Sequence, residues 1–228
     1  IYDQSADRFI LFFLYETTHV KSQTVIAFSE TNDPAGTWNL YKLPGNPLNN
    51  KLWSDYPMVA LSEKEVFLTL NLLKDNTGWK EGFAETIIWQ IDKESGYRGD
   101  DTLIANLLHD ILFDGKPVRN LCPVKGGEKA YGSNMYFLSN KNLSLENDTV
   151  FLVEVTNEYG HPDSKLNVKM GLSATKYYFP PTARQGNGHT FDTNDSRVLG
   201  AFFNNGSIQY VHNTLNPTTA RAAVYHGF

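Results

Sequence analysis

Short runs of apolar residues, each bounded by turn residues, dominate the chain. The runs are rich in Val, Ile, Phe, Tyr and Thr, and Asn, Asp, Gly or Pro separates them, which is typical of β-strands. Many runs are apolar at successive positions, as in strands that are covered on both faces. We expect strands at 8–16, 24–29, 38–43, 56–61, 65–73, 85–92, 134–139, 149–156, 165–172, 197–203, 207–213 and 221–228. Residues 100–114 predict either a short helix or an irregular insertion.

The predicted strands fall into repeating groups, which begin near Ile1, Asp55, Val118 and Asp195. Each group opens at a tight turn, continues through an inner strand and long apolar strands, and ends on a more polar strand. One small antiparallel sheet every 40 to 60 residues or so is the pattern of a β-propeller, whereas a two-sheet sandwich would not repeat the group order. We predict an all-β fold, a single propeller domain over 1–228, with four-stranded blades near 1–50, 51–117, 118–190 and 191–228, the last one incomplete.

Both ends of the chain lie close to predicted strands. The first residue is Ile1 rather than Met, and the last segment, "AAVYHGF", is apolar. A propeller protects its sheet edges by closing its ring. We therefore expect the chain to be a fragment of a longer propeller, or to receive further strands from another chain.

Composition narrows the function classes only slightly. The chain has 228 residues, of which 41% are hydrophobic and 13% aromatic, so it can bury a substantial core. The net charge is −5 without blocks of like charge, which argues against nucleic acid as a partner. No apolar run approaches the roughly 20 residues of a membrane helix. The single cysteine, Cys122, excludes an intrachain disulfide, and its strand-like context predicts a small buried side chain.

The segment "SETNDPAGTW" predicts a tight turn between the third and fourth strands of the first blade. Asp33 can accept hydrogen bonds from the backbone of its own turn, and Pro34 fixes φ at the first central position. We expect Gly36 to supply a positive φ and Trp38 to pack back under the turn. These residues have a structural role in this interpretation.

This turn resembles the S-x-D-x-G-x-T-W Asp-box of sialidase-like propellers, although the chain has only one such box. Over nearly its whole length the chain resembles a family of secreted bacterial β-propeller proteins, of the kind found in large extracellular proteins of gliding, polysaccharide-degrading bacteria. The segments that carry this resemblance are "YDQSADRFILFFL", "SETNDPAGTW", "WSDYPMVALSEKEVFLTLN", "YYFPPTARQGNGHTFDTNDSRVLGAFFNNGSIQYVHN" and "AAVYHGF".

The resemblance implies a location outside the cell or on its outer surface, and it says more about fold than about chemistry. We expect a binding or scaffold module without catalytic activity. Its partners would be other protein domains or chains at the cell surface, and glycans. The alternative is a carbohydrate-active glycoside hydrolase.

Two carboxylates precede predicted inner strands, where propellers bind ligands around their axis. Asp55 lies in "WSDYP", and Asp195 lies in "FDTNDSRV" with Arg197 close by. A glycosidase uses such a pair, one carboxyl as acid and the other ionised. The other interpretation is that both carboxylates cap turns and that Arg197 pairs with one of them. The sequence leaves both open.

Further candidate residues surround these strand ends. The spacing of Asp192, Asn194 and Asp195 leaves a calcium site open, although it differs from an EF-hand loop. The histidines lack the spacing of a zinc site, and no nucleotide-binding motif is present, so we expect no other cofactor. Aromatic and polar side chains could contact a ligand, or the aromatic ones could cover a sheet. These candidates are Tyr56, Tyr177, Tyr178, Arg184 and Gln185.

Overall fold

The computed structural model describes residues 1–126 and 132–228, which form four antiparallel sheets arranged as the blades of a β-propeller. The first sheet contains β1 (Tyr2–Asp3), β2 (Arg8–Tyr15), β3 (Gln23–Ser29) and β4 (Trp38–Pro44). The second contains β5 (Leu52–Leu61), β6 (Glu65–Lys74), β7 (Phe83–Asp92) and β8 (Ala105–Leu108). The third contains β11 (Cys122–Pro123), β12 (Met135–Asn140), β13 (Glu146–Thr156) and β14 (Lys165–Tyr178). The fourth contains β17 (Val198–Asn204), β18 (Ser207–Asn216) and β19 (Arg221–Gly227).

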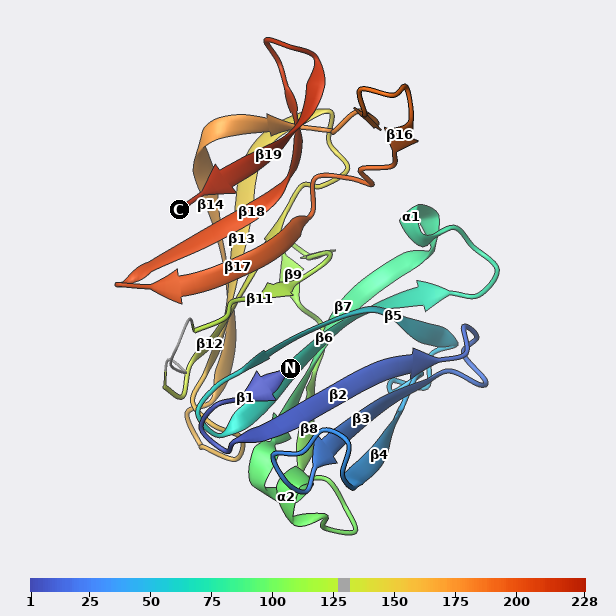
Figure 1. Ribbon diagram of the computed structural model, residues 1–228, viewed down its shortest axis with the longest axis vertical. Coiled ribbons are helices and arrows are strands. Elements are labelled where there is room, and N and C mark those ends of the chain that lie inside the picture. The colour runs from blue at the N-terminus through green and yellow to red at the C-terminus, as the bar shows by residue number, and fades with distance from the viewer. Residues whose placement is uncertain (127–131) are drawn as a thin grey trace.

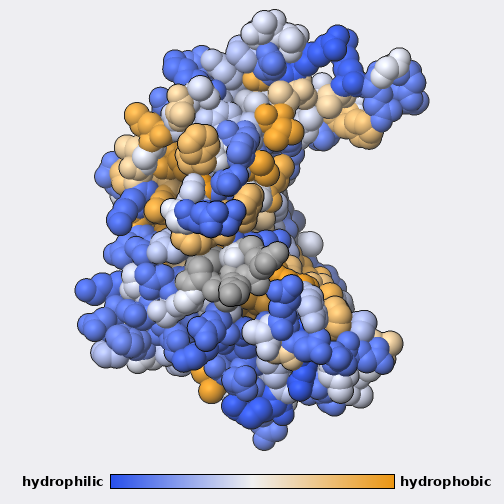
Figure 2. All heavy atoms as spheres, turned by 60° about the vertical axis from the view of Figure 1, so that its left-hand side comes forward, coloured by the Kyte–Doolittle hydropathy of each residue, from blue (hydrophilic) through white to orange (hydrophobic). Residues whose placement is uncertain are grey.

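The sheets follow one another in chain order, and within each sheet the strands are also in sequence order. Figure 1 shows the first two sheets in the lower part of the view, the third running upright and the fourth at the top. Figure 2 shows that the outline is hollowed between the upper and lower parts. The predicted propeller is therefore confirmed, and the two-sheet sandwich is excluded.

Smaller elements connect these sheets. They are the hairpin of β9 (Leu112–Phe113) with β10 (Lys116–Pro117), the hairpin of β15 (Ala183–Arg184) with β16 (Thr190–Phe191), and the helices α1 (Trp79–Gly82) and α2 (Lys93–Arg98). A search of the described residues finds no helix with the length and apolar character needed to cross a membrane.

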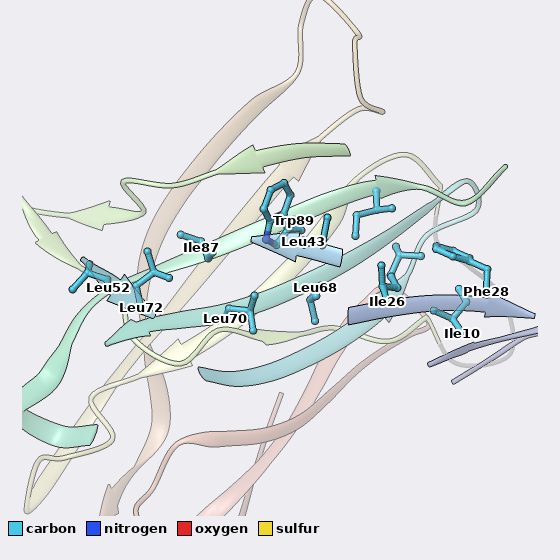
Figure 3. Packing of buried hydrophobic residues seen from close by; sticks show 12 residues of the cluster. Ile10, Ile26, Phe28, Leu43, Leu52, Leu68, Leu70, Leu72, Ile87 and Trp89 are labelled. Carbon is cyan, nitrogen blue, oxygen red and sulfur yellow. The ribbon is translucent and has the colours of Figure 1, made fainter. Parts of the chain in front are cut away.

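The second sheet is buried on both faces, which explains why its strands read as continuous apolar runs. In β6, nine consecutive residues are buried. The side chains of Leu68 and Leu70 point to the first sheet and join Ile10, Ile26 and Phe28 in one cluster, which Figure 3 shows from close by. The alternate residues of β6 face the third sheet instead.

Aromatic side chains fill the other two interfaces between sheets. Phe67 of β6 meets Phe137 of β12 edge to face, with 5.9 Å between ring centroids. Between the third and fourth sheets, the Tyr177 ring lies edge-on to His212, and His212 stacks on Tyr225 at 4.7 Å. Each pair of neighbouring sheets thus encloses a core of its own.

The turn between β3 and β4 forms where it was predicted, with two differences. The Asp33 side chain accepts from the Ala35 N–H at 2.9 Å, and the Trp38 indole N–H donates to the Pro34 carbonyl at 3.2 Å. Trp38 is half-buried rather than buried, because the turn projects into solvent. Gly36 does not adopt a positive φ. Its N–H donates to the Asp33 carbonyl, which closes the turn without one.

The helix considered for residues 100–114 is wrong, because this segment contributes β8 and β9. A helix forms just before it, in α2. The Asp92 side chain caps its first turn by accepting from the Ser95 N–H at 2.6 Å, and Gly99 ends it with φ +72°. Gly96 allows α2 to lie against Phe28, since a Cβ atom at Gly96 would come within 2.5 Å of that ring.

A buried ion pair fastens α2 to the first sheet. The Lys93 ammonium lies 2.8 Å from the Asp3 carboxylate, and both side chains are about 5% exposed or less. Asp3 also accepts from the Tyr97 hydroxyl and from Ser5. Burial opposes the ionisation of Asp3, but the hydrogen bonds from Lys93, Ser5 and Tyr97 outweigh it and hold the pKa of Asp3 below its usual value.

Asp3→Ala should therefore lower the free energy of unfolding by about 3 to 5 kcal/mol, because Lys93 would remain buried without a partner. The exposed Asp101→Ala variant is the control and should change it by less than about 1 kcal/mol. Urea unfolding at pH 7 measures both. Because the pKa of Asp3 is lower in the folded chain than in the unfolded one, its contribution should be present above about pH 4 and be lost as the pH falls through the folded-state pKa. A loss no larger than that of the control would contradict this account.

Candidate functional site

Charged and aromatic side chains gather beside the inner strands of three sheets, at the bulge in β5 and just before β11 and β17. We name as the axial cluster Tyr56, Trp79, Phe83, Arg119, Asp195 and Arg197. The inner strand β11 contacts both β5 and β17, so residues from three sheets meet here. The loop between β6 and β7, which contains α1, reaches the same place.

A bulge in β5 places Tyr56 in this cluster. The register between β5 and β6 shifts between Asp55 and Met58, and Tyr56 has a φ of +54°. This value is unusual for a residue with a bulky side chain. Through the bulge, the ring of Tyr56 comes to lie 4.5 Å from the Arg197 guanidinium carbon.

The carboxylate of Asp195 is fully engaged. One oxygen accepts from the backbone N–H and the Nε of Arg197, and the other accepts from Nη2 of Arg197 and Nδ2 of Asn142. These four bonds use the four acceptor positions that an ionised carboxylate offers. The residue is 1% exposed. Asp195 and Arg197 thus form the turn-capping ion pair that was one of the two interpretations of this segment.

Arg197 contacts two aromatic rings. Its guanidinium carbon lies 4.7 Å from the centroid of the Trp79 ring and 4.5 Å from that of Tyr56. Burial alone would lower the pKa of Arg197, but its bonds to Asp195 outweigh this effect, and the pKa is raised. Burial raises the pKa of Tyr56, although the neighbouring Arg197 opposes this. Arg197 therefore stays charged and Tyr56 stays protonated at neutral pH.

Arg119 adds a second positive charge, and among the described residues it forms no ion pair with a carboxylate. Its guanidinium lies over Phe83 at 4.5 Å and donates to the carbonyls of Trp79 and Lys80, while its Nε is buried without a hydrogen-bond partner among the described residues. Burial and the charge of Arg197 lower the pKa of Arg119. Arg197 is paired with Asp195, so Arg119 is the arginine of the cluster that no ion pair neutralises within the described residues.

Asp55 differs from Asp195 in both the burial and the hydrogen bonding of its carboxylate. It is half-buried, and within the described ranges no hydrogen bond to its side chain is found. The two carboxylates thus have different environments, as a catalytic pair requires, but Asp195 is closed to water and substrate. The catalytic role suggested for Asp55, Asp195 and Arg197 stays a hypothesis.

The other predicted contact residues are dispersed. Tyr177 is fully buried and its hydroxyl donates to the Thr149 carbonyl, so of the two interpretations it covers a sheet and is not exposed to a ligand. Tyr178 is half-buried and bound through its backbone to Thr214. Arg184 and Gln185 are exposed beside a groove of about 820 Å³ at the β15–β16 hairpin.

The residues proposed for calcium do not form one ligand set. Asp192 and Asn194 are exposed, and the Asp192 side chain accepts from the Asn194 N–H at 2.8 Å. Asp195 has no acceptor position left for a cation. Elsewhere in the described residues, Glu85, His109 and Asp110 bring their ligand atoms within 4.8 Å of one another on the surface.

Sequence reasoning missed Trp79, Phe83 and Arg119. Trp79 lies on the connection between β6 and β7, which gives no periodic signal, and Phe83 is the first residue of β7, just outside the predicted strand. Arg119 could have been found, because it precedes the inner strand β11 much as Arg197 precedes β17. Cys122, at the start of β11, is buried as predicted, and burial raises its pKa to about 12, so it is not a reactive thiol.

No protein-family model and no curated protein matches the chain. Among solved structures, the Trypanosoma rangeli sialidase in complex with 2,3-difluorosialic acid, a covalent intermediate, is similar with a TM-score of 0.40 and 10% sequence identity. The match covers 96% of this chain, which spans 43% of the sialidase chain.

Asp195→Ala should lower the free energy of unfolding by about 3 to 5 kcal/mol, because Arg197 would remain buried without its acid. Asp55→Ala is the matched variant at the other predicted carboxylate, and it should change stability by less than about 1 kcal/mol. Guanidinium unfolding followed by tryptophan fluorescence measures both. Equal losses in the two variants would show that the carboxylates share one role, contrary to this description.

Proposed function

We propose that this chain is a non-catalytic binding and scaffold module that acts outside the cell or on its outer surface. The location rests on the family resemblance of the sequence. The geometry of the axial cluster supports the absence of a catalytic role. The exposed faces of the first and fourth sheets support the scaffold role.

The observation that carries the proposal is the closure of Asp195. A glycoside hydrolase needs two carboxyl groups that both reach the substrate, one to protonate the leaving group and one to act as base or nucleophile. The Asp195 carboxylate accepts four hydrogen bonds and is buried, so exposing it would break the pair with Arg197. This supports a structural carboxylate and a propeller face that binds rather than hydrolyses.

The scaffold role is supported by two sheet faces with large exposed apolar side chains. On the first sheet, Leu11, Phe13 and Leu40 are between 45% and 62% exposed. On the fourth, Phe202 and Val224 are 41% and 71% exposed. Figure 2 shows apolar residues gathered over the upper part of the molecule, where Figure 1 places the fourth sheet. Such faces are typical of surfaces that meet another protein.

Between the sheets of this chain, the same kind of face is always covered by a neighbouring sheet. We infer that the partner of each exposed face is another β-sheet, in a different domain or chain at the cell surface.

The absence of hydrolysis is directly testable. Wild-type protein incubated with a panel of neutral and acidic polysaccharides should release no reducing sugar above the buffer control. Asp55→Asn and Asp195→Asn should be indistinguishable from it in this assay. Reducing sugar that the wild type releases, and that both variants fail to release while remaining folded, would establish the glycoside hydrolase instead.

The apolar faces predict concentration-dependent association. Sedimentation velocity should show the wild type associating as its concentration rises, and Leu11→Gln with Phe13→Gln should weaken this because polar side chains no longer gain from burial. The control replaces Lys21 and Lys42, exposed residues of the same sheet region, with Gln. A wild type that stays monomeric at several hundred micromolar would contradict this prediction and show that copies of this chain do not cover each other's faces.

A further inference from the structure

A pocket of about 560 Å³ opens beside the axial cluster, between the β9–β10 hairpin and the turn that joins β12 to β13. The hairpin contributes Phe113 and Lys116, and the turn contributes Lys141 and Ser144. Phe151 and Met170, from β13 and β14, complete its apolar side. The pocket therefore combines charged, polar and apolar groups, as sites for small polar ligands do.

The charge of the pocket is opposite to that of the chain. Lys116, Arg119 and Lys141 line it, and among the described residues Asp114 is the only acidic one in its lining, whereas the whole chain has a net charge of −5. Within 1–126 and 132–228, no carboxylate lies within ion-pair distance of Lys116 or Lys141. Two exposed ammonium groups are therefore available to an anion.

Arg119 also lines the pocket and adds to its positive charge. Its guanidinium donates to two backbone carbonyls but is bound to no carboxylate among the described residues. Its positive charge is thus held in place without a direct ion pair, although Asp195 and Glu81 lie near enough to act on it. A fixed cation in a partly buried position acts more strongly on a ligand than an exposed, mobile one.

The apolar side of the pocket favours an anion that also has an apolar surface. Phe113 is half-buried and its ring lies 5.5 Å from that of Phe151, and Lys141 lies over Phe151 at 5.4 Å. A simple ion would leave this surface uncovered. A sugar ring has apolar C–H faces that can cover an aromatic ring, and hydroxyl groups that the Ser144 hydroxyl and the Asp114 carboxylate can bind.

We propose that this pocket binds an acidic sugar unit, with Lys116 and Lys141 on its carboxylate or sulfate group and Phe113 against its ring. This inference rests on the proposed binding function and names the class of ligand. It places the site between the β9–β10 hairpin and the third sheet, beside the axial cluster rather than on Asp55 or Asp195.

Calorimetric titration with three probes tests the proposal: tetragalacturonate, the neutral galactotetraose and sodium sulfate. Tetragalacturonate should bind, and its affinity should fall as sodium chloride is raised, because the contact is electrostatic. Galactotetraose and sulfate should each bind at least ten-fold more weakly, since each makes only part of the contact. No binding of tetragalacturonate, or sulfate binding as tight as that of the oligosaccharide, would overturn the proposal.

Variants then locate the site. Lys116→Gln with Lys141→Gln should weaken tetragalacturonate binding at least ten-fold, whereas Lys21→Gln with Lys42→Gln, which makes the same change in net charge, should leave it unaltered. Phe113→Ala should weaken the oligosaccharide and leave the response to sulfate unchanged. Equal losses in both double variants would show a non-specific charge effect and refute the site. These titrations measure binding alone. Hydrolysis of a polysaccharide would therefore contradict the proposed function and leave the evidence for the binding site unchanged.

Discussion

The fold depends on one constraint: an apolar sheet face is stabilised only where another sheet covers it. The second sheet meets this condition, with Leu68 and Leu70 of β6 packed against the first sheet and Phe67 against the third. Burying such side chains stabilises the fold by roughly 1.5 to 3 kcal/mol each. The same constraint leaves a problem at the first and fourth sheets, each of which presents one apolar face to solvent, and this is why we assign those faces to partner sheets.

Because the sheets are strongly apolar, charged side chains buried between them need partners of opposite charge. A charge near the sheet interfaces is stabilised only if it is paired and hydrogen-bonded, and the chain does this twice with similar means. Asp3 near the first sheet binds Lys93, and Asp195 at the start of β17 binds Arg197. Arg119, among the described residues, forms no ion pair with a carboxylate. Asp195 thus holds the sheets together at the axial cluster, and in the proposed binding mode the cations without an ion pair attract the ligand.

The repeat of apolar runs was sufficient to predict the propeller and nearly all its long strands, because period and turn residues are local properties. The two-residue strands β1, β9, β10, β15 and β16 are not predictable from the sequence, since two residues carry no period, and only the strand-like context of Cys122 indicates β11. The site was predicted only in part. Asp195, Arg197 and Tyr56 do come together, but nothing in the sequence places Trp79 beside them, because three sheets must pack before these residues meet. The sequence also leaves open whether Tyr177 meets a ligand or covers a sheet, because its burial depends on the packing of the fourth sheet.

The central claim is that this face of the propeller binds an acidic glycan and does not cut it. Proton NMR of tetragalacturonate in the presence of the protein tests both halves in one sample. The account predicts that the oligosaccharide signals broaden on addition of protein and that no new anomeric signals form over several days. New anomeric signals that grow with time in the wild type, and that are lost in a folded Asp195→Asn variant, would contradict it.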